Sequence, residues 1–164
     1  MPSASSAASH EGLFNQGMNK LFICDMREDD IPAILEIEKI SFTIPWSEQD
    51  FLNELYKKNA FPKVAVFERN IIGYICVNYH LHEAQILNLA VHKDFRRQGV
   101  ATILMDEAIR ELNKKGCAFI YLKVRVSNTS AQRFYELFGF KVESIRKKYY
   151  GYPDEDALLM MRRL

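Results

Sequence analysis

The part of the sequence that most constrains the fold runs from residue 63 to residue 116, because its apolar residues change from the period of strands to that of a helix. KVAVFE at 63–68 and IIGYICVNYH at 71–80, joined by a tight turn at Arg69-Asn70, form a hairpin signature, and AQILNLAVH at 84–92 predicts a third strand. An amphipathic helix of about four turns follows and ends near Gly116. Its apolar stripe consists of Val100, Ile103, Leu104, Ala108, Ile109 and Leu112.

The same patterns divide the rest of the chain into helices and strands. LFICDM at 21–26 predicts a first strand, the acidic residues before Pro32 predict the start of a helix, and Ser47-Glu48-Gln49-Asp50 resembles a capping box that opens a second helix. After Gly116, AFIYLKVRV, KVESIRKKYY and DALLMMRRL predict strands, and Thr129-Ser130-Ala131-Gln132 caps a helix that Gly139 closes. The order β-α-α-β-β-β-α-β-α-β-β predicts an α/β fold with a mixed central β-sheet and helices on both faces.

Length and charge favour a single domain with no overall attraction to polyanions. The chain has 164 residues and a formal net charge of +1, so we expect no direct nucleic-acid partner and no membrane partner. Residues 1–17 show no period and are interpreted as a disordered tail or cloning scar, leaving a domain at 18–164. Three cysteines without a C-x-x-C pair argue against both a disulfide framework and a metal site, so a reducing, cytoplasmic location is expected.

The loop DFRRQGVA at 94–101 has the pattern of an anion site. It lies between a strand and a helix start, where the first helical N–H groups lack internal partners and the helix dipole favours negative charge. Arg96 and Arg97 would add positive charge, Gly99 would let the backbone approach a pyrophosphate closely, and Ala101 is small. On these residues alone, a solvated basic turn that caps an ordinary helix is an equal interpretation.

Longer motifs give this loop a context. RRQGVA resembles the Q/R-x-x-G-x-G/A pyrophosphate loop of the GNAT acetyltransferases. LNLAVHKDFRRQGVATILM, YLKVRVSNTSAQRFYELFGF, KKYYGYPDEDALLM and IPWSE resemble segments of the RimI-type and archaeal protein N-terminal acetyltransferases. The resemblance extends from about Met18 to the C-terminus and implies the GNAT fold, with acetyl-CoA as cosubstrate and no metal.

The resemblance also implies roles for individual residues. The backbone of the strand end would pair with the pantetheine arm, the loop and helix start would wrap the pyrophosphate, and Asn128 would hydrogen-bond the cofactor further along. Tyr135 would protonate the departing thiolate, although its spacing from Phe134 and Phe138 also suits a core aromatic. The cofactor-binding residues expected in this way are Leu89, Ala90, Val91, Arg96, Arg97, Gln98, Gly99, Val100, Ala101, Thr102 and Asn128.

One position departs from the family pattern. The RimI-type strand YLEVR carries a glutamate proposed as general base, whereas this chain has YLKVR, with Lys123 at that place. Strand alternation directs Lys123 toward the site, where an orienting or product-side role is the plainer interpretation because a protonated lysine cannot take a proton. Water chains to Glu83, to His82 or to a backbone carbonyl are alternative routes for the proton.

The missing base favours one kind of amine. A peptide α-amino group with a pKa of about 7.8 is roughly 14% neutral at pH 7, so reaching the neutral form costs only about 1.1 kcal/mol. The same step for a lysine side chain with a pKa of about 10.4 costs about 4.6 kcal/mol. A site without a strong base therefore favours protein N-termini.

The substrate would lie between two loops. Tyr149-Tyr150 matches the paired tyrosines that line the peptide groove in the family, and Pro45-Trp46 would form the opposite wall, although both pairs also suit plain hydrophobic packing. Arg146, Lys147 and Lys148 make either a contact for acidic substrate residues or a solvated basic face.

We therefore expect an acetyl-CoA-dependent enzyme that acetylates the free N-terminal α-amine of a protein, with ribosomal proteins among the candidate substrates, and that acts as a monomer or weak homodimer. Acetylation of a small-molecule amine or of an internal lysine is one alternative, because those activities share the cofactor half of the fold. A non-catalytic acyl-CoA-binding module is another, suggested by Lys123.

Overall fold

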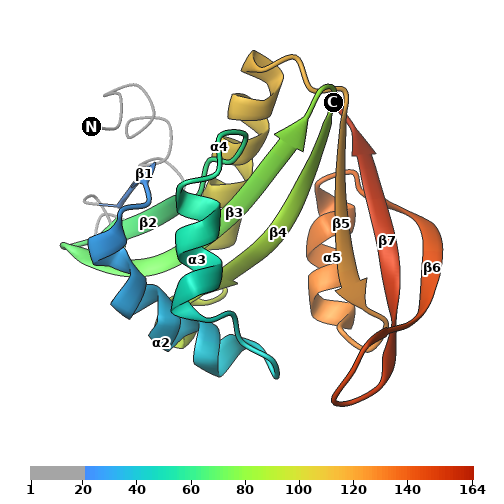
Figure 1. Ribbon diagram of the computed structural model, residues 1–164, viewed down its shortest axis with the longest axis horizontal. Helices are drawn as coiled ribbons and strands as arrows, with labels where there is room; N and C mark the ends of the chain where they lie inside the picture. Colours follow the sequence, from blue (N-terminus) through green and yellow to red (C-terminus); the bar gives the residue numbers. More distant parts are fainter. Residues whose placement is uncertain (1–20) are drawn as a thin grey trace.

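The computed structural model describes residues 21–164, which form a seven-stranded sheet with helices on both faces (Figure 1). The strands lie in the order β1-β2-β3-β4-β5-β7-β6 and span Phe22–Asp25 (β1), Lys63–Phe67 (β2), Asn70–His80 (β3), Glu83–Val91 (β4), Phe119–Arg125 (β5), Lys141–Tyr150 (β6) and Glu155–Arg163 (β7). The helices are α2 (Ile31–Ser41), α3 (Glu48–Leu55), α4 (Val100–Lys114) and α5 (Thr129–Leu137), with short 3₁₀ turns at η2 (Glu28–Asp30) and η3 (Lys93–Phe95). The predicted element order and fold class are confirmed, whereas the prediction for residues 1–17 lies outside the described residues.

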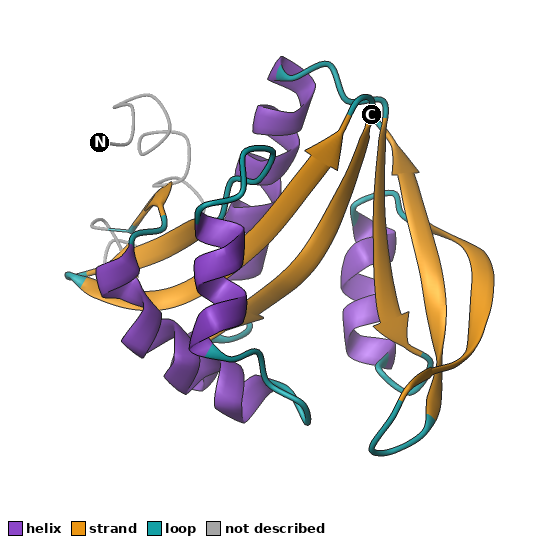
Figure 2. Cartoon of the chain, viewed as in Figure 1, coloured by secondary structure: helices purple, strands orange, loops and turns teal. Residues whose placement is uncertain are grey.

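Helices cover both faces of the sheet (Figure 2), and a hydrophobic core lies on each face. On one face, α4 residues such as Ile103 pack with Ile120 of β5, and the aromatic side of α5 packs against the same core. On the other face, Ile34 of α2 and Phe51 of α3 pack over Tyr74 of β3. The face of β5 opposite Ile120 therefore lies on the same side of the sheet as α2 and α3.

Local sequence signals explain where the helices begin. In the predicted capping box, the Ser47 hydroxyl accepts the Asp50 N–H at 3.2 Å, and the Asp50 carboxylate accepts the Ser47 N–H at 2.8 Å. Every member of the predicted α4 stripe is buried except Ile109, which is partly buried. The capping box at the start of α3 and the apolar stripe of α4 are therefore confirmed.

Two predicted details are wrong by one residue. The β2–β3 turn is Glu68-Arg69, whose φ angles of 49° and 70° suit a tight hairpin turn, and Asn70 instead begins β3. The cap of α5 is Asn128, whose side-chain oxygen accepts the Ala131 N–H at 3.1 Å, and Thr129 is the first helical residue. Asparagine is the stronger N-cap residue of the two.

The sheet opens between β4 and β5. These strands pair in parallel only where Glu83–Gln85 meets Phe119–Tyr121, and beyond that point they diverge (Figure 1). On its other side, β4 stays paired with β3, but the register shifts so that Leu87 is an extra residue on β4. Such a bulge bends its strand locally. The divergence leaves the second half of β4 with one edge that no described strand covers.

Candidate active site

The open edge of β4 offers the backbone groups that an extended ligand needs. His92 N–H donates to Ile72 O at 2.7 Å, and alternation from that bond directs the backbone groups of Ala90 to β3 and those of Leu89 and Val91 to the open edge. The predicted backbone contacts to a pantetheine arm would therefore involve Leu89 and Val91 rather than Ala90. The side chain of Ala90 packs in the core beneath α2.

The loop after β4 exposes the first turn of α4. Arg97 and Gly99 both have left-handed backbone conformations, with φ angles of 63° and 86°. Gly99 supplies no side-chain cap, and the first bond into the helix is Ile103 N–H to Gly99 O at 3.1 Å. The N–H groups of the three residues between them are thus directed out of the helix end, where they suit a pyrophosphate; these residues are Val100, Ala101 and Thr102.

The two arginines of this loop differ. The guanidinium of Arg96 donates to Val91 O at 2.9 Å and to the Ser41 hydroxyl at 3.0 Å, so its side chain ties the loop to the ends of β4 and α2. Arg97 and Gln98 are exposed, and Gln98 donates to Asp94 O at 3.3 Å. Arg97 is the better placed of the two arginines to meet a phosphate with its side chain.

Helix α5 carries the predicted acid. The ring of Tyr135 contacts those of Phe134 and Phe140 at centroid distances of 5.4 Å and 5.7 Å. Burial, and secondarily Tyr150, raise the pKa of the Tyr135 phenol well above its ordinary value, so the hydroxyl keeps its proton throughout the physiological range. At the helix start, Asn128 uses its side-chain oxygen for the cap, while its NH₂ group donates to no residue in 21–164.

Lys123 lies on the face of β5 that alternation predicts. Its neighbours Leu122 and Val124 point into the α4 core, while Lys123 is partly exposed on the opposite face and its ammonium lies 5.3 Å from the ring centroid of Tyr149. The proposed relay residues are elsewhere. Glu83 pairs with Phe119, four residues before Lys123 and hence about 13 Å along the strand.

His82 is also remote from Lys123. It lies in the β3–β4 turn, with Nδ1 3.3 Å from Gly116 O. Both residues thus lie at the closed end of the β4–β5 pair, away from Lys123, and a water chain from either of them to the site stays a prediction.

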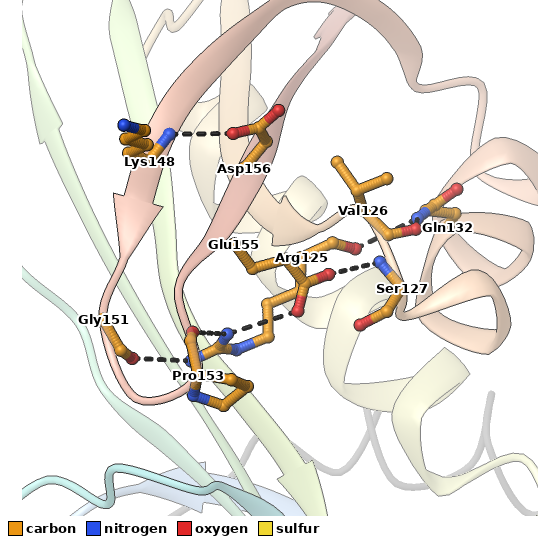
Figure 3. Close-up of polar contacts among 9 residues, drawn as sticks. All are labelled: Arg125, Val126, Ser127, Gln132, Lys148, Gly151, Pro153, Glu155 and Asp156. Carbon is orange, nitrogen blue, oxygen red and sulfur yellow. Dashed lines mark hydrogen bonds and ion pairs between the residues drawn. The ribbon is translucent and has the colours of Figure 1, made fainter.

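Tyr149 and Tyr150 are the last two residues of β6 rather than turn residues, and the turn that follows them, at 151–154, is built around Arg125 (Figure 3). The Arg125 guanidinium donates to the carbonyls of Pro153 at 3.0 Å and Gly151 at 3.4 Å and to Glu155 at 3.3 Å, and it stacks 4.3 Å from the Tyr150 ring centroid. The other oxygen of Glu155 accepts the Ser127 N–H just before α5, and the bonds from Ser127 and Arg125 lower the pKa of this carboxyl. One ion pair thus connects this turn to the helix of Tyr135. No local pattern in the sequence indicates these contacts, because the partners are far apart in the chain.

The Pro45-Trp46 segment, the predicted substrate wall, is held by a buried carboxylate that no sequence pattern led us to predict. Glu38 of α2 is 1% exposed and accepts the Trp46 N–H at 3.0 Å, while the Trp46 ring packs 5.1 Å from that of Phe51. The same carboxylate accepts the hydroxyl of Tyr74 and the side-chain NH₂ of Asn88, the latter at 2.9 and 3.0 Å. Burial raises the pKa of Glu38 despite these donors. Its spacing of four from Ile34, on the apolar stripe of α2, was the available signal.

The sequence and the fold of this chain are similar to those of known acetyltransferases. The model of the acetyltransferase (GNAT) family matches residues 31–140. A putative [ribosomal protein bS18]-alanine N-acetyltransferase of Bacillus subtilis is 36% identical over 143 residues, which cover 86% of this chain and 94% of that protein. The crystal structure of the ribosomal-protein-S18-alanine N-acetyltransferase from Escherichia coli superposes with a TM-score of 0.81 at 32% identity, covering 87% of this chain and 93% of that one. Ard1 from Thermoplasma volcanium gives a TM-score of 0.82 at 27% identity, covering 88% and 98%.

The chain therefore belongs to the GNAT acetyltransferase family. It is an N-acetyltransferase with acetyl-CoA as cosubstrate, and the open β4 edge and the uncapped start of α4 fit that thioester. Among residues 21–164, no cluster of three or more His, Cys, Asp or Glu has the arrangement of a metal site. No helix in that range is long and apolar enough to cross a membrane.

Proposed function

We propose that this protein acetylates the free N-terminal α-amine of a protein substrate, with ribosomal protein N-termini as the first candidates. Relatives named for alanine N-acetylation of ribosomal protein bS18 share up to 38% identity with the chain, which supports this substrate class. The observation that carries the proposal is the open β4 edge beside the uncapped α4 start. The Pro45-Trp46 segment and the end of β6 at Tyr149-Tyr150 would flank the substrate.

The proposed chemistry is direct attack of the amine on the thioester carbonyl. The outward N–H groups at the β4 edge would polarise that carbonyl. Tyr135, whose phenol stays protonated, would donate its proton to the sulfur as the carbon–sulfur bond breaks. A positive charge at Lys123 disfavours a second positive charge nearby, so it would favour the neutral form of an amine bound beside it.

The identity of the modified nitrogen decides the substrate class. We would incubate the protein with acetyl-CoA and four peptides, with free or blocked N-termini and with or without lysine, and locate the acetyl group by fragmentation mass spectrometry. Acetylation that requires a free N-terminus and ignores lysine is expected. Acetyl-CoA binding with no product on any peptide would instead favour a binding module, and lysine modification would favour the other alternative.

The role of Tyr135 is tested by Tyr135→Phe. Removing the hydroxyl should lower kcat about a hundredfold and leave acetyl-CoA affinity unchanged, because the ring still packs between Phe134 and Phe140. Tyr79→Phe on β3, where the ring lies against Lys115, is the matched control and should retain kcat. A kcat for Tyr135→Phe within a factor of about two of the unmodified protein would rule out its acid role.

A further inference from the structure

We propose that Asn88 of β4 receives the attacking amino group of the substrate through its side-chain carbonyl oxygen, and that Glu38 is the positioning residue that turns the Asn88 amide this way. The inference rests on the proposed function and deepens it. It concerns the step between peptide binding and acetyl transfer, when the amine must be held beside the cosubstrate.

The hydrogen bonds of Asn88 fix the orientation of its amide. Asn88 is 7% exposed, and its Nδ2 donates to both oxygens of the Glu38 carboxylate, at 3.0 and 2.9 Å. An ionised carboxylate only accepts hydrogen bonds, so the NH₂ end of the amide must face Glu38 and the carbonyl end must face away. A nine-tenths buried amide is thereby locked in one direction.

The carbonyl end of that amide has no partner among residues 21–164. Within those residues, Glu54 Oε2 is the only side-chain oxygen or nitrogen that is both closed off from solvent and without a hydrogen bond. Asn88 Oδ1 also has no hydrogen bond, so it must still be accessible to solvent. Buried polar groups in native proteins are nearly always paired, and a remaining acceptor of this kind calls for a donor from outside the chain. A substrate amine is such a donor.

The location of Asn88 suits that donor. It lies between the extra residue Leu87 and the edge residue Leu89, at the level where β4 has left β5. Its side chain points to the α2 side of the sheet, which is also the side of Lys123. The expected thioester and the expected amine would therefore meet at neighbouring residues of one strand.

The chemistry of an amide oxygen suits an amine that must lose its proton. A carboxylate at this place would stabilise the ammonium form by its charge and raise the amine pKa. A neutral carbonyl accepts an N–H from either form and leaves more of the amine neutral and nucleophilic. A neutral acceptor facing the Lys123 side is thus consistent with a site that has no glutamate on β5.

The same carboxylate places the substrate wall. Glu38 accepts hydrogen bonds from both the Trp46 N–H and the Asn88 amide. One buried carboxylate therefore positions both the wall for the substrate's first residue and the acceptor for its amine. A change at Glu38 should accordingly weaken peptide binding while acetyl-CoA binding is retained.

The decisive test compares two peptides that differ only at the amino group. One has a free α-amine and the other carries hydrogen in its place, and the affinity of each is measured by calorimetry with the protein saturated with CoA. Unmodified protein should prefer the amino peptide about tenfold, as one hydrogen bond of this type provides. In Asn88→Ala the preference should fall to about twofold or less, whereas Asn78→Ala, a partly buried asparagine of β3, should retain it.

The ratio of the two peptide affinities distinguishes a lost contact to the amine from a general loosening of the site. A merely loosened site would weaken both peptides equally and keep the ratio, and acetyl-CoA affinity reports whether each variant is folded. An undiminished preference in Asn88→Ala overturns the inference. If the unmodified protein acetylates no N-terminus at all, the proposed function fails first, and that result is read from the mass spectra before any variant is made.

A swap of the pair gives a second readout. Glu38→Gln together with Asn88→Asp keeps a donor facing an acceptor but presents a carboxylate oxygen to the amine. The rise of kcat with pH should shift to higher pH by about one unit, because the carboxylate stabilises the ammonium form of the bound amine. A folded double variant with an unshifted profile would contradict the proposed contact.

Discussion

Lys123 and Glu38 show how single charges are used at this site. Lys123 stands where the related strand has a glutamate, and it lies on the ring of Tyr149 instead of beside an acid. Glu38 is the reverse case, a carboxylate held inside the core by donors from three other segments, Trp46, Tyr74 and Asn88. At neither position could the burial and the contacts of the side chain be predicted from the residue type alone.

Changing Lys123 tests whether the site works without a base. Lys123→Glu should raise kcat/KM below pH 8 and move the pH profile toward acid, because a carboxylate beside the amine can take its proton. The measurement is kcat/KM from pH 6 to pH 9 with an N-terminal peptide. An unchanged profile would mean that the proton leaves by another route.

The raised pKa of Glu38 gives stability a definite pH dependence. Between the ordinary glutamate pKa and the raised folded value, the folded chain keeps a proton that the unfolded chain has lost, so this group's contribution to stability falls as pH rises through that window. Tyr74 and Asp50 are the titratable groups that act on it. Urea unfolding from pH 4.5 upward should show the fall, and Glu38→Gln should flatten it, whereas Glu36→Gln on the exposed side of α2 should not.

At the scale of elements, the join between β4 and α4 does the most for function. The bulge at Leu87 turns β4 away from β5, and the left-handed Gly99 ends the loop so that the first turn of α4 is left uncapped. One join thus presents both a strand edge and a helix N-terminus, which would suit one elongated ligand.

Glycine at position 99 can be tested against an internal control. Gly99→Ala forces a side chain into a φ of 86° and should cost about 1 kcal/mol of stability, as should Gly116→Ala, whose φ is 73° and whose added Cβ would meet nothing within 4 Å. Only Gly99→Ala should also weaken acetyl-CoA binding, by tenfold or more. Calorimetry with acetyl-CoA separates them, and equal affinity in the two variants would remove the loop from the cofactor site.

The elements and their order can be predicted from periodicity, because each helix or strand buries one face and its apolar residues show the matching spacing. Contacts between segments that are distant in the chain cannot be predicted in this way. Glu36 and Glu38 are two residues apart on α2, and only Glu38 is buried. The spacing of Glu38 from Ile34 indicates its buried face, but no local pattern indicates its partner fifty residues away at Asn88. Arg125 likewise meets Glu155 only because β5 pairs with β7. The geometry of the loop at 94–101 was predictable because all of its parts are local.

At the scale of the whole molecule, the sheet is two units joined by a narrow seam. β1–β4 and β5–β7 meet through three residue pairs, and the two cores lie on opposite faces of the sheet. The predicted substrate walls would come from both units, since Trp46 precedes α3 and Tyr149 is the next-to-last residue of β6.

A ligand that bonds along this seam should act on global stability. Acetyl-CoA at about a hundred times its dissociation constant should add about 2.7 kcal/mol to the unfolding free energy. Amide hydrogen exchange should slow most at Leu89 and Val91 and little in β1–β2. Uniform slowing across all strands, or none, would argue against binding at the β4 edge.

The narrow seam also bears on the lifetime of the protein. If acetyl-CoA supplies hydrogen bonds to the β4 edge, the sheet opens more often when acetyl-CoA is scarce, and proteases act on the opened molecules. Limited proteolysis should therefore cut the β4–β5 region faster as acetyl-CoA is withdrawn, so that the abundance of the catalyst would follow the supply of its own acyl donor.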